Sequence, residues 1–217
     1  MAEKIFIMGA GGHGRVVLDI LLESKDYEVV GFLDSDPKLH GKFVNNHKVF
    51  GDISLIPKLI KEKGVIGSII AIGHNETRSM FFKKFKKAGL IIINAIHPSA
   101  IISKTAKIGS GVVVSARATV WTDSIIGDNC IINTGVIVEH QNIIEDNVHI
   151  ASGAQLGGNV KIKQNTTIGA GSTIIPYINV GKNVMVGAGS VVINDISDGV
   201  TAVGVPAKVK EKSKLQK

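Results

Sequence analysis

Aliphatic side chains recur at every sixth position through the C-terminal half of the chain. The row starts at Ile96, ends at Val192 and holds 17 positions, all of them Ile, Leu or Val, with no insertion. A period of six fits neither an α-helix, which repeats about every 3.6 residues, nor a strand, which alternates about every two. It is typical of a parallel β-helix built from hexapeptide repeats. We therefore expect a coil whose interior is filled by this row.

A second period, of 18 residues, marks the corners of that coil. Asparagine recurs at one corner and glycine at the next, and both tolerate the positive φ that a tight corner often needs. The asparagines are Asn129, Asn147, Asn165 and Asn183, and the glycines are Gly135, Gly153, Gly171 and Gly189. Three hexapeptides thus make one triangular turn. The third corner is irregular, so we look for chemistry there; it carries Asp123, Gln141, Asn159, Tyr177 and Asp195.

The residues before the coil alternate between short apolar runs and segments with helical spacing. The apolar runs are 4–8, 28–33 and 68–72, and the helical segments are 15–24, 54–63 and 75–88. Such alternation predicts a parallel, Rossmann-like sheet. The expected fold class is therefore an α/β domain over residues 1–91, followed by an all-β parallel β-helix over 92–197. Residues 198–217 are expected to form a C-terminal tail.

A glycine-rich loop follows the first predicted strand. Gly9, Gly11 and Gly14 match the dinucleotide-binding spacing, and Asp34 comes about twenty residues later. Glycines at a helix start let backbone N–H groups approach a phosphate. The domain looks short for a full dinucleotide fold, so we favour a nucleotide or nucleotide-sugar cradle over a structural turn and over NAD. Three strand ends should share one edge of the sheet, at Gly11 to His13, Asp34, and Gly73 to Asn75.

Composition and charge narrow the class of protein. The net charge is +7, and the last ten residues supply +4 of it, because they hold five Lys and one Glu. We interpret this run as a solvated tail, and we find no basic stripe with stacking aromatics that would predict a nucleic-acid partner. We see no signal peptide and no apolar run of about 18 residues, so no membrane partner is expected. The single cysteine, Cys130, falls at an inward small position and suits a reducing cytoplasm.

The histidines differ in their predicted surroundings. His40 and His47 fall in a polar loop and are expected to be exposed, whereas His97 is expected to cap or pack. His140 occupies the irregular corner, and His149 should point outward from a strand. A neutral imidazole beside a polar partner is suited to general-base work near pH 7. His140 is therefore the candidate base, although an isolated surface histidine usually has no such role.

Three sets of motifs resemble one family and together cover nearly the whole chain. The first is Gly9-Ala10-Gly11-Gly12-His13-Gly14 with Phe32-Leu33-Asp34, and the second is Ala71-Ile72-Gly73-His74-Asn75-Glu76-x-Arg78. The third comprises Ile132-Asn133-Thr134-Gly135, Val138-Glu139-His140, His149-Ile150-Ala151, Gly158-Asn159-Val160 and the closing Gly204-Val205-Pro206-Ala207-Lys208. With these motifs the chain resembles the hexapeptide-repeat sugar acyltransferases of the bacterial sialic-acid O-acetyltransferase and UDP-4-amino-sugar N-acetyltransferase group.

The resemblance implies a left-handed coil, acetyl-CoA as co-substrate and a homotrimer. It also implies that His140 is the base, with Gln141 beside it where the family commonly has an acidic residue. The implied acetyl-CoA contacts are His149, Ala170, Gly171, Gly187 and Ala188, and the implied nucleotide-sugar contacts are Gly11, Gly12, His13, Asp34 and Gly73. In a trimer, neighbouring chains would cover outward apolar residues such as Ile125, Ile137, Ile143 and Val191.

The expected reaction is direct acetyl transfer in the cytoplasm, without a metal. His140 would take a proton from the amine of a nucleotide-linked 4-amino-4,6-dideoxy sugar as that amine attacks the thioester, while a backbone N–H holds the oxyanion. A sialic-acid-type hydroxyl is the alternative acceptor. Two alternatives come from other classes. A metal-dependent hydratase would need a third histidine beyond His140 and His149, which the coil does not obviously supply. A trimeric nucleotide-binding regulatory module would use the coil only to assemble.

Overall fold

The computed structural model describes residues 2–210. It divides into two compact units, Met1–Pro98 and Ser99–Lys217. The division falls a few residues beyond the domain boundary predicted between residues 91 and 92. Residues 211–217, most of the basic run in the predicted tail, lie outside the described part.

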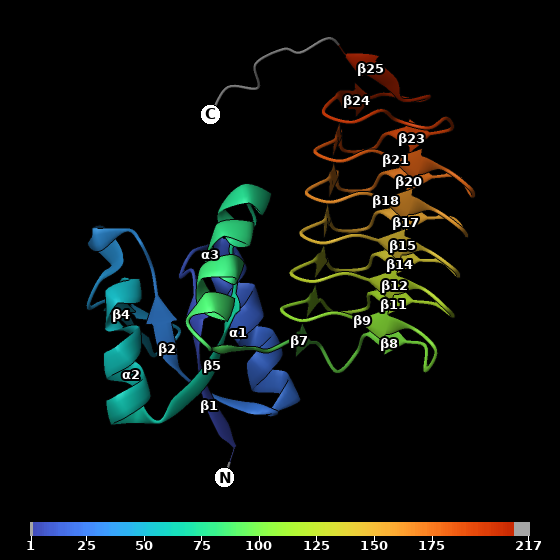
Figure 1. The fold of residues 1–217 in the computed structure, drawn as a ribbon. Coiled ribbons are helices and arrows are strands. Elements are labelled where there is room, and N and C mark those ends of the chain that lie inside the picture. Colours follow the sequence, from blue (N-terminus) through green and yellow to red (C-terminus); the bar gives the residue numbers. More distant parts are fainter. Residues whose placement is uncertain (1, 211–217) are drawn as a thin grey trace. The chain divides into compact units, whose positions relative to one another are not determined.

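A six-stranded sheet forms the centre of the N-terminal unit (Figure 1). Its order is β3-β4-β2-β1-β5-β6; β3 pairs antiparallel with β4, and the other pairs are parallel. The strands of this sheet are β1 (Glu3–Met8), β2 (Tyr27–Leu33), β3 (Phe43–Val44), β4 (His47–Gly51), β5 (Val65–Ile70) and β6 (Ile91–Ile92). The short β7 (Ala95–Ile96) follows and is not part of it. The helices are α1 (Gly12–Ser24), α2 (Ile56–Lys63), α3 (Asn75–Lys87) and the 3-10 turns η1 (Pro37–Leu39) and η2 (Ile53–Leu55). The prediction of a parallel, Rossmann-like domain is confirmed.

Aromatic side chains fix α3 to this sheet. Phe6 of β1 and Phe85 of α3 are both buried and meet edge-on, with ring centroids 5.7 Å apart. Phe81 lies one helical turn earlier on α3 and belongs to the same core cluster. Such pairs add to the stabilisation from area burial. This packing holds α3 against the sheet.

Helix α1 starts earlier than its apolar pattern predicted. It begins at Gly12 rather than Arg15, with Gly11 in an extended conformation as the N-cap. The glycine-rich loop therefore supplies the first turn of the helix. Backbone N–H groups of that turn have no partner within the helix.

The segment predicted as a polar loop contains the hairpin β3–β4. Its two turn residues, Asn45 and Asn46, have φ of 44° and 64°. Positive φ at both central residues is what a two-residue hairpin turn of type I′ requires. The expectation that His40 and His47 are exposed is wrong, because both are half-buried. His40 Nε2 lies 2.8 Å from the carbonyl oxygen of Asp34, and His47 Nδ1 lies 2.7 Å from that of Asn45.

The C-terminal unit is a left-handed parallel β-helix (Figure 1). Face 1 consists of β8 (Ile101–Ile102), β11 (Thr119–Val120), β14 (Ile137–Val138), β17 (Gln155–Leu156), β20 (Thr173–Ile174) and β23 (Val191–Val192). Face 2 consists of β9 (Lys107–Ile108), β12 (Ile125–Ile126), β15 (Ile143–Ile144), β18 (Lys161–Ile162) and β21 (Asn179–Val180). Face 3 contains β10 (Val113–Val114), β13 (Ile131–Ile132), β16 (His149–Ile150), β19 (Thr167–Ile168) and β22 (Met185–Val186).

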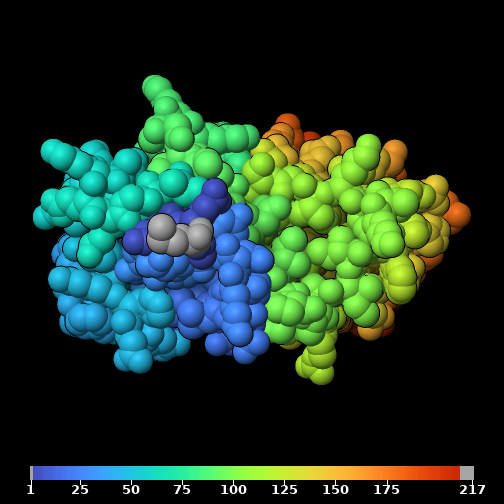
Figure 2. Space-filling model, turned by 90° about the horizontal axis from the view of Figure 1, so that it is seen from below, coloured from blue at the N-terminus to red at the C-terminus, as the bar shows by residue number. Residues whose placement is uncertain are grey.

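The six-residue row fills the interior of the coil, as predicted. Every member from Val114 to Val192 is buried, while Ile102 and Ile108 in the first turn are half-buried. Parallel pairs join residues 18 apart, as in Ile132 with Ile150. Figure 2 looks onto these first turns, in light green.

The corners have the backbone conformation that their residue types predicted. The repeating asparagines have φ between 54° and 61°, and the repeating glycines between 64° and 70°. At the irregular corner the residues with positive φ are Asp123, Gln141, Asn159 and Tyr177. Both the regular and the irregular corners therefore contain a residue whose backbone lies in the left-handed region of φ/ψ space.

The coil continues into the segment predicted as a tail. Strand β24 (Thr201–Val203) pairs parallel with β22, and β25 (Lys208–Lys210) pairs antiparallel with β24. These strands extend face 3. Across residues 2–210, no helix is long and apolar enough to cross a membrane.

Candidate functional site

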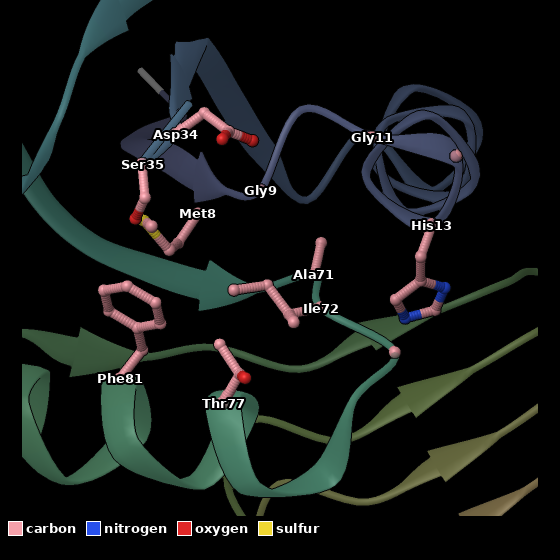
Figure 3. Close-up of a pocket in the computed structure, with 12 residues that line it drawn as sticks. Met8, Gly9, Gly11, His13, Asp34, Ser35, Ala71, Ile72, Thr77 and Phe81 are labelled. Carbon is pink, nitrogen blue, oxygen red and sulfur yellow. The ribbon is translucent and has the colours of Figure 1, made fainter. Parts of the chain in front are cut away.

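A cavity of about 360 Å³ opens at the carboxyl ends of β1, β2 and β5 (Figure 3). All five residues expected to contact a nucleotide sugar line it, namely Gly11, Gly12, His13, Asp34 and Gly73. The carboxyl edge of a parallel sheet is where open α/β folds bind ligands. The lining also includes residues that the sequence analysis did not name as contacts, namely Met8, Gly9, Ser35, Ala71, Ile72, Thr77 and Phe81.

The glycines around the cavity have two different roles. A Cβ at Gly14 would lie 2.0 Å from the carbonyl oxygen of Gly9, and a Cβ at Gly9 would lie 2.7 Å from that of Ala71. These two glycines are needed for the loop to close. Gly11 and Gly12 would meet nothing within 4 Å. Their lack of a side chain leaves backbone open toward the cavity.

Asp34 ties this loop to the end of β2. Its Oδ2 accepts a hydrogen bond of 2.7 Å from the Ala10 N–H, and its Oδ1 accepts one of 2.8 Å from the Asp36 N–H. Each carboxylate oxygen can accept a second bond. Asp34 therefore shapes the loop first, and its remaining lone pairs can serve a ligand in the cavity.

Two helices begin at the cavity. Gly12 and His13 open α1, and Thr77 lies in the first turn of α3. At α3 the N-cap His74 accepts a bond from the Thr77 N–H through Nδ1. Helix N-termini carry partial positive charge and unpaired N–H groups, which favour anions. Two of them facing one cavity favour an anionic ligand such as a diphosphate.

Arg78 holds the turn between β5 and α3. The side chain is buried, with 1% of the residue exposed. Nη1 donates to the carbonyl oxygens of Ile72 and Gly73, at 3.1 and 3.0 Å, and Nη2 donates to Asn75 Oδ1 at 2.8 Å. The guanidinium thus fixes the wall of the cavity that Gly73 forms. It also adds a full positive charge to this end of the unit.

The candidate base lies at the irregular corner of the coil. His140 is exposed, and its Nδ1 lies 3.1 Å from Gln141 Oε1. An amide oxygen can only accept, so this contact favours the tautomer with the hydrogen on Nδ1, in which Nε2 of a neutral imidazole carries the lone pair. The imidazole rests on the backbone of Gly158 in the next turn. Asn159 Nδ2 approaches Gln141 Oε1 at 3.5 Å, the limit of a hydrogen bond.

The residues expected to contact acetyl-CoA lie elsewhere on the coil. His149 is half-buried on face 3, whereas Ala170, Gly171 and Ala188 are exposed at the corner between faces 3 and 1. Gly187 is half-buried, and a Cβ there would lie 2.6 Å from the Val203 side chain, so it makes room for β24. Among residues 2–210, no three His, Cys, Asp or Glu side chains are grouped so that they could hold a metal ion.

The base and these residues lie on different parts of one coil. His140 and Gln141 form the corner between β14 of face 1 and β15 of face 2. Face 3, which carries His149, is the side of the triangle opposite that corner. A single chain therefore does not bring His140 and His149 together.

The fold and the cavity define a hexapeptide-repeat protein with an α/β nucleotide-type domain. The family model called PglD N-terminal domain matches residues 4–85, and the bacterial transferase hexapeptide model matches residues 143–176. A variant of perosamine N-acetyltransferase from Caulobacter crescentus, solved with CoA and GDP-perosamine, is 36% identical with a TM-score of 0.92, covering 98% of this chain and 99% of that one. The chain belongs to the family of PglD-type hexapeptide-repeat sugar acyltransferases.

Two further relatives support this assignment. The acetyltransferase domain of PglB from Neisseria gonorrhoeae is 34% identical with a TM-score of 0.89, covering 96% of this chain and 100% of that one. UDP-N-acetylbacillosamine N-acetyltransferase from Bacillus subtilis is 37% identical over 119 residues, or 52% of each chain. The chain thus spans about half the length of the curated relatives it matches.

Proposed function

We propose that this protein is an acetyl-CoA-dependent N-acetyltransferase whose acceptor is the amine of a nucleotide-linked 4-amino-4,6-dideoxy sugar. Three relatives are N-acetyltransferases or acetyltransferase domains by name, and the Caulobacter protein was solved with CoA and a nucleotide-linked amino sugar. The observation that carries the chemistry is the placement of His140. Its ring is seated on Gly158, and Gln141 orients it so that Nε2 has the lone pair.

The cavity of the N-terminal unit is the proposed nucleotide-sugar site. Two helix N-termini and the buried Arg78 favour the charge of a diphosphate. Gly11 and Gly12 leave backbone open to the phosphates. Apolar Met8, Ile72 and Phe81, with the polar Asp34 and Ser35, line the rest and suit a nucleobase with a polar edge.

His140 acts as the general base in the proposed reaction. As the amine nitrogen attacks the thioester carbon, Nε2 takes one proton from it and Gln141 accepts the Nδ1–H of the resulting imidazolium. The carbon–sulfur bond then breaks, the thiolate receives the proton from the imidazolium, and CoA leaves as a thiol. A new amide bond joins the acetyl group to the sugar. No acyl-enzyme and no metal enter this route.

Acetyl-CoA is proposed to lie between two chains of a homotrimer. His140 lies at one corner of the coil and His149 lies on the face opposite that corner, so we infer that two neighbouring chains together supply the base and the coenzyme contacts. Exposed apolar side chains support such packing, since Ile125 is 42% and Ile143 is 39% exposed. The corner between faces 3 and 1 carries small, exposed residues, against which the extended chain of acetyl-CoA can lie; they are Ala170, Gly171 and Ala188. Cytoplasmic acetyl-CoA and the buried free thiol of Cys130 suit a cytoplasmic location.

A substrate panel tests the proposal. CoA release is followed with a thiol reagent for GDP-, UDP- and dTDP-linked 4-amino-4,6-dideoxy sugars, with sialic acid, and with the matching 4-hydroxy sugar nucleotides as controls. The proposal predicts release only with the amino sugars, and mass spectrometry should find one added acetyl group. Release with sialic acid alone would instead support the O-acetyltransferase alternative. Nucleotide binding without any release would support the regulatory module.

A further inference from the structure

We propose that Asn142 is a positioning residue for His140. Asn142 follows the His140–Gln141 corner, and none of the residue is exposed to solvent. Its side chain is buried inside the coil, out of reach of a ligand on the surface. The inference rests on the proposed function only in taking His140 as the reacting group.

The side-chain amide of Asn142 joins two successive corners. Nδ2 donates to the carbonyl of Glu139, the residue before His140, and at 3.0 Å to the carbonyl of Gly157, the residue before Gly158. Oδ1 accepts a bond of 3.0 Å from the Val160 N–H. The corner that carries the imidazole is thereby bonded to the corner on which the imidazole rests.

Ser124, in the preceding turn of the coil, makes two hydrogen bonds to the same corner. Ser124 Oγ donates to the Glu139 carbonyl at 2.8 Å and accepts from the Asn142 N–H at 3.2 Å. The Glu139 carbonyl thus receives two donors. Backbone bonds also join the two turns near the ring, from the Glu139 N–H to the Leu156 carbonyl at 3.1 Å and from the Asn159 N–H to the His140 carbonyl at 3.0 Å. The Asn142 side chain adds its bonds to these.

The coil itself does not require an asparagine at this inward position. Residues at the same place in the following turns are Val160, Ile178 and Ile196, all buried. Burying an amide among apolar neighbours is unfavourable unless its hydrogen bonds are made. Asn142 has these bonds, and they lie at the turn that carries His140. We infer that these hydrogen bonds fix the position of the His140 imidazole over Gly158.

The closing experiment compares Asn142→Val with Thr166→Val. Valine fits position 142, because Val160 fills the equivalent place one turn later. Thr166 is the matched control: it is fully buried, its Oγ1 donates to the Gly181 carbonyl at 2.6 Å and accepts from the Val184 N–H at 3.0 Å, and it lies at a different corner. Both variants remove buried bonds that link successive turns.

We expect Asn142→Val to lower kcat roughly 10- to 100-fold, because a small displacement of a reacting group has an effect of that size. KM for both substrates should stay within a factor of about three of the wild-type value, since this side chain is fully buried inside the coil. Thr166→Val should lower Tm by a similar amount and keep kcat. Asn142→Ser, which restores one hydroxyl donor, should recover part of the loss. Unchanged kcat in Asn142→Val, or an equal loss in Thr166→Val, would overturn the inference.

A measurement independent of activity keeps this result separate from the proposed function. The Cε1–H resonance of His140, assigned by its loss in His140→Ala, should shift or broaden in Asn142→Val and remain in place in Thr166→Val. An unchanged resonance would overturn the positioning role even if the protein transfers no acetyl group. An inactive wild-type protein would overturn the proposed function and leave the NMR comparison to decide the role of Asn142.

Discussion

The imidazole of His140 is seated on Gly158, 18 residues further along and one turn up the coil. A Cβ at Gly158 would lie 2.5 Å from Cε1 and 2.6 Å from Nε2 of the ring. The backbone of Gly158 is not in the left-handed region. Glycine is therefore needed at this position to leave room for the ring, and not to permit an unusual backbone conformation.

Replacing Gly158 with alanine should therefore displace the base. Relieving the overlap requires the ring to move by about 1 Å, and a shift of that size can lower a rate roughly 100-fold. The ring belongs to an exposed side chain, so Tm should change little. Steady-state kcat and a thermal melt of Gly158→Ala measure both effects. Wild-type kcat in a folded Gly158→Ala would show that the observed ring position is not the reacting one.

Glutamate in place of Gln141 should change the pH profile. A carboxylate beside an imidazole favours its protonated form, so the acidic limb of the kcat/KM profile should move to higher pH. The profile of Gln141→Glu is compared with that of Gln164→Glu, which adds the same charge at another exposed position. Equal shifts in both variants would indicate a general charge effect instead of the contact at His140 Nδ1.

Tyr177 has a backbone conformation that its side chain does not favour. Its φ is 66° and the residue is 74% exposed. Left-handed backbone costs most residues about 1 kcal/mol or more, and asparagine tolerates it better. Tyr177→Asn should raise the free energy of unfolding by about 1 kcal/mol, as measured by urea denaturation. Tyr177→Ala keeps the strain and should give no such gain, and a loss of stability in Tyr177→Asn would contradict this account of the corner.

Two glycines of one loop should respond differently to alanine. Gly14→Ala places a Cβ 2.0 Å from a backbone oxygen, so the N-terminal unit should be strongly destabilised. Gly12→Ala meets nothing within 4 Å and should fold, but its methyl group enters the proposed phosphate site. Circular dichroism and nucleotide-sugar titration separate the two effects. Tight nucleotide binding by Gly12→Ala would contradict the proposed placement of the phosphates at this loop.

The coil could be predicted in detail because its signal is repeated. Each turn gives one more example of the aliphatic row, and the corner residues show where φ is positive. The hairpin β3–β4 gives only one local signal, the pair Asn45–Asn46 between short strands. Asparagine tolerates positive φ, so this pair is compatible with a two-residue turn, but it is a weaker signature than Asn-Gly or Asp-Gly. The partial burial of His47 depends on packing that the pair does not specify.

The candidate site was predictable where a residue follows closely after a strand. Gly11, Asp34 and Gly73 lie just beyond the ends of β1, β2 and β5, and topology alone brings those ends together. Thr77 and Phe81 line the same cavity from one face of α3. Their place depends on how the helix packs through Phe85, which the sequence pattern does not specify. The 18-residue period places Gly158 one turn above His140, but it does not specify the side-chain conformation that brings the ring over Gly158.

The central claim is that His140 removes the proton from the acceptor amine. The most direct test is the kcat of His140→Ala with acetyl-CoA and the nucleotide-linked amino sugar that the wild-type protein acetylates. Loss of a positioned base lowers a rate by roughly 10²- to 10⁴-fold, and an exposed corner side chain contributes little to Tm. We predict a loss of kcat in that range with an unchanged melt. A His140→Ala protein that keeps most of its kcat would contradict the claim and place the base elsewhere.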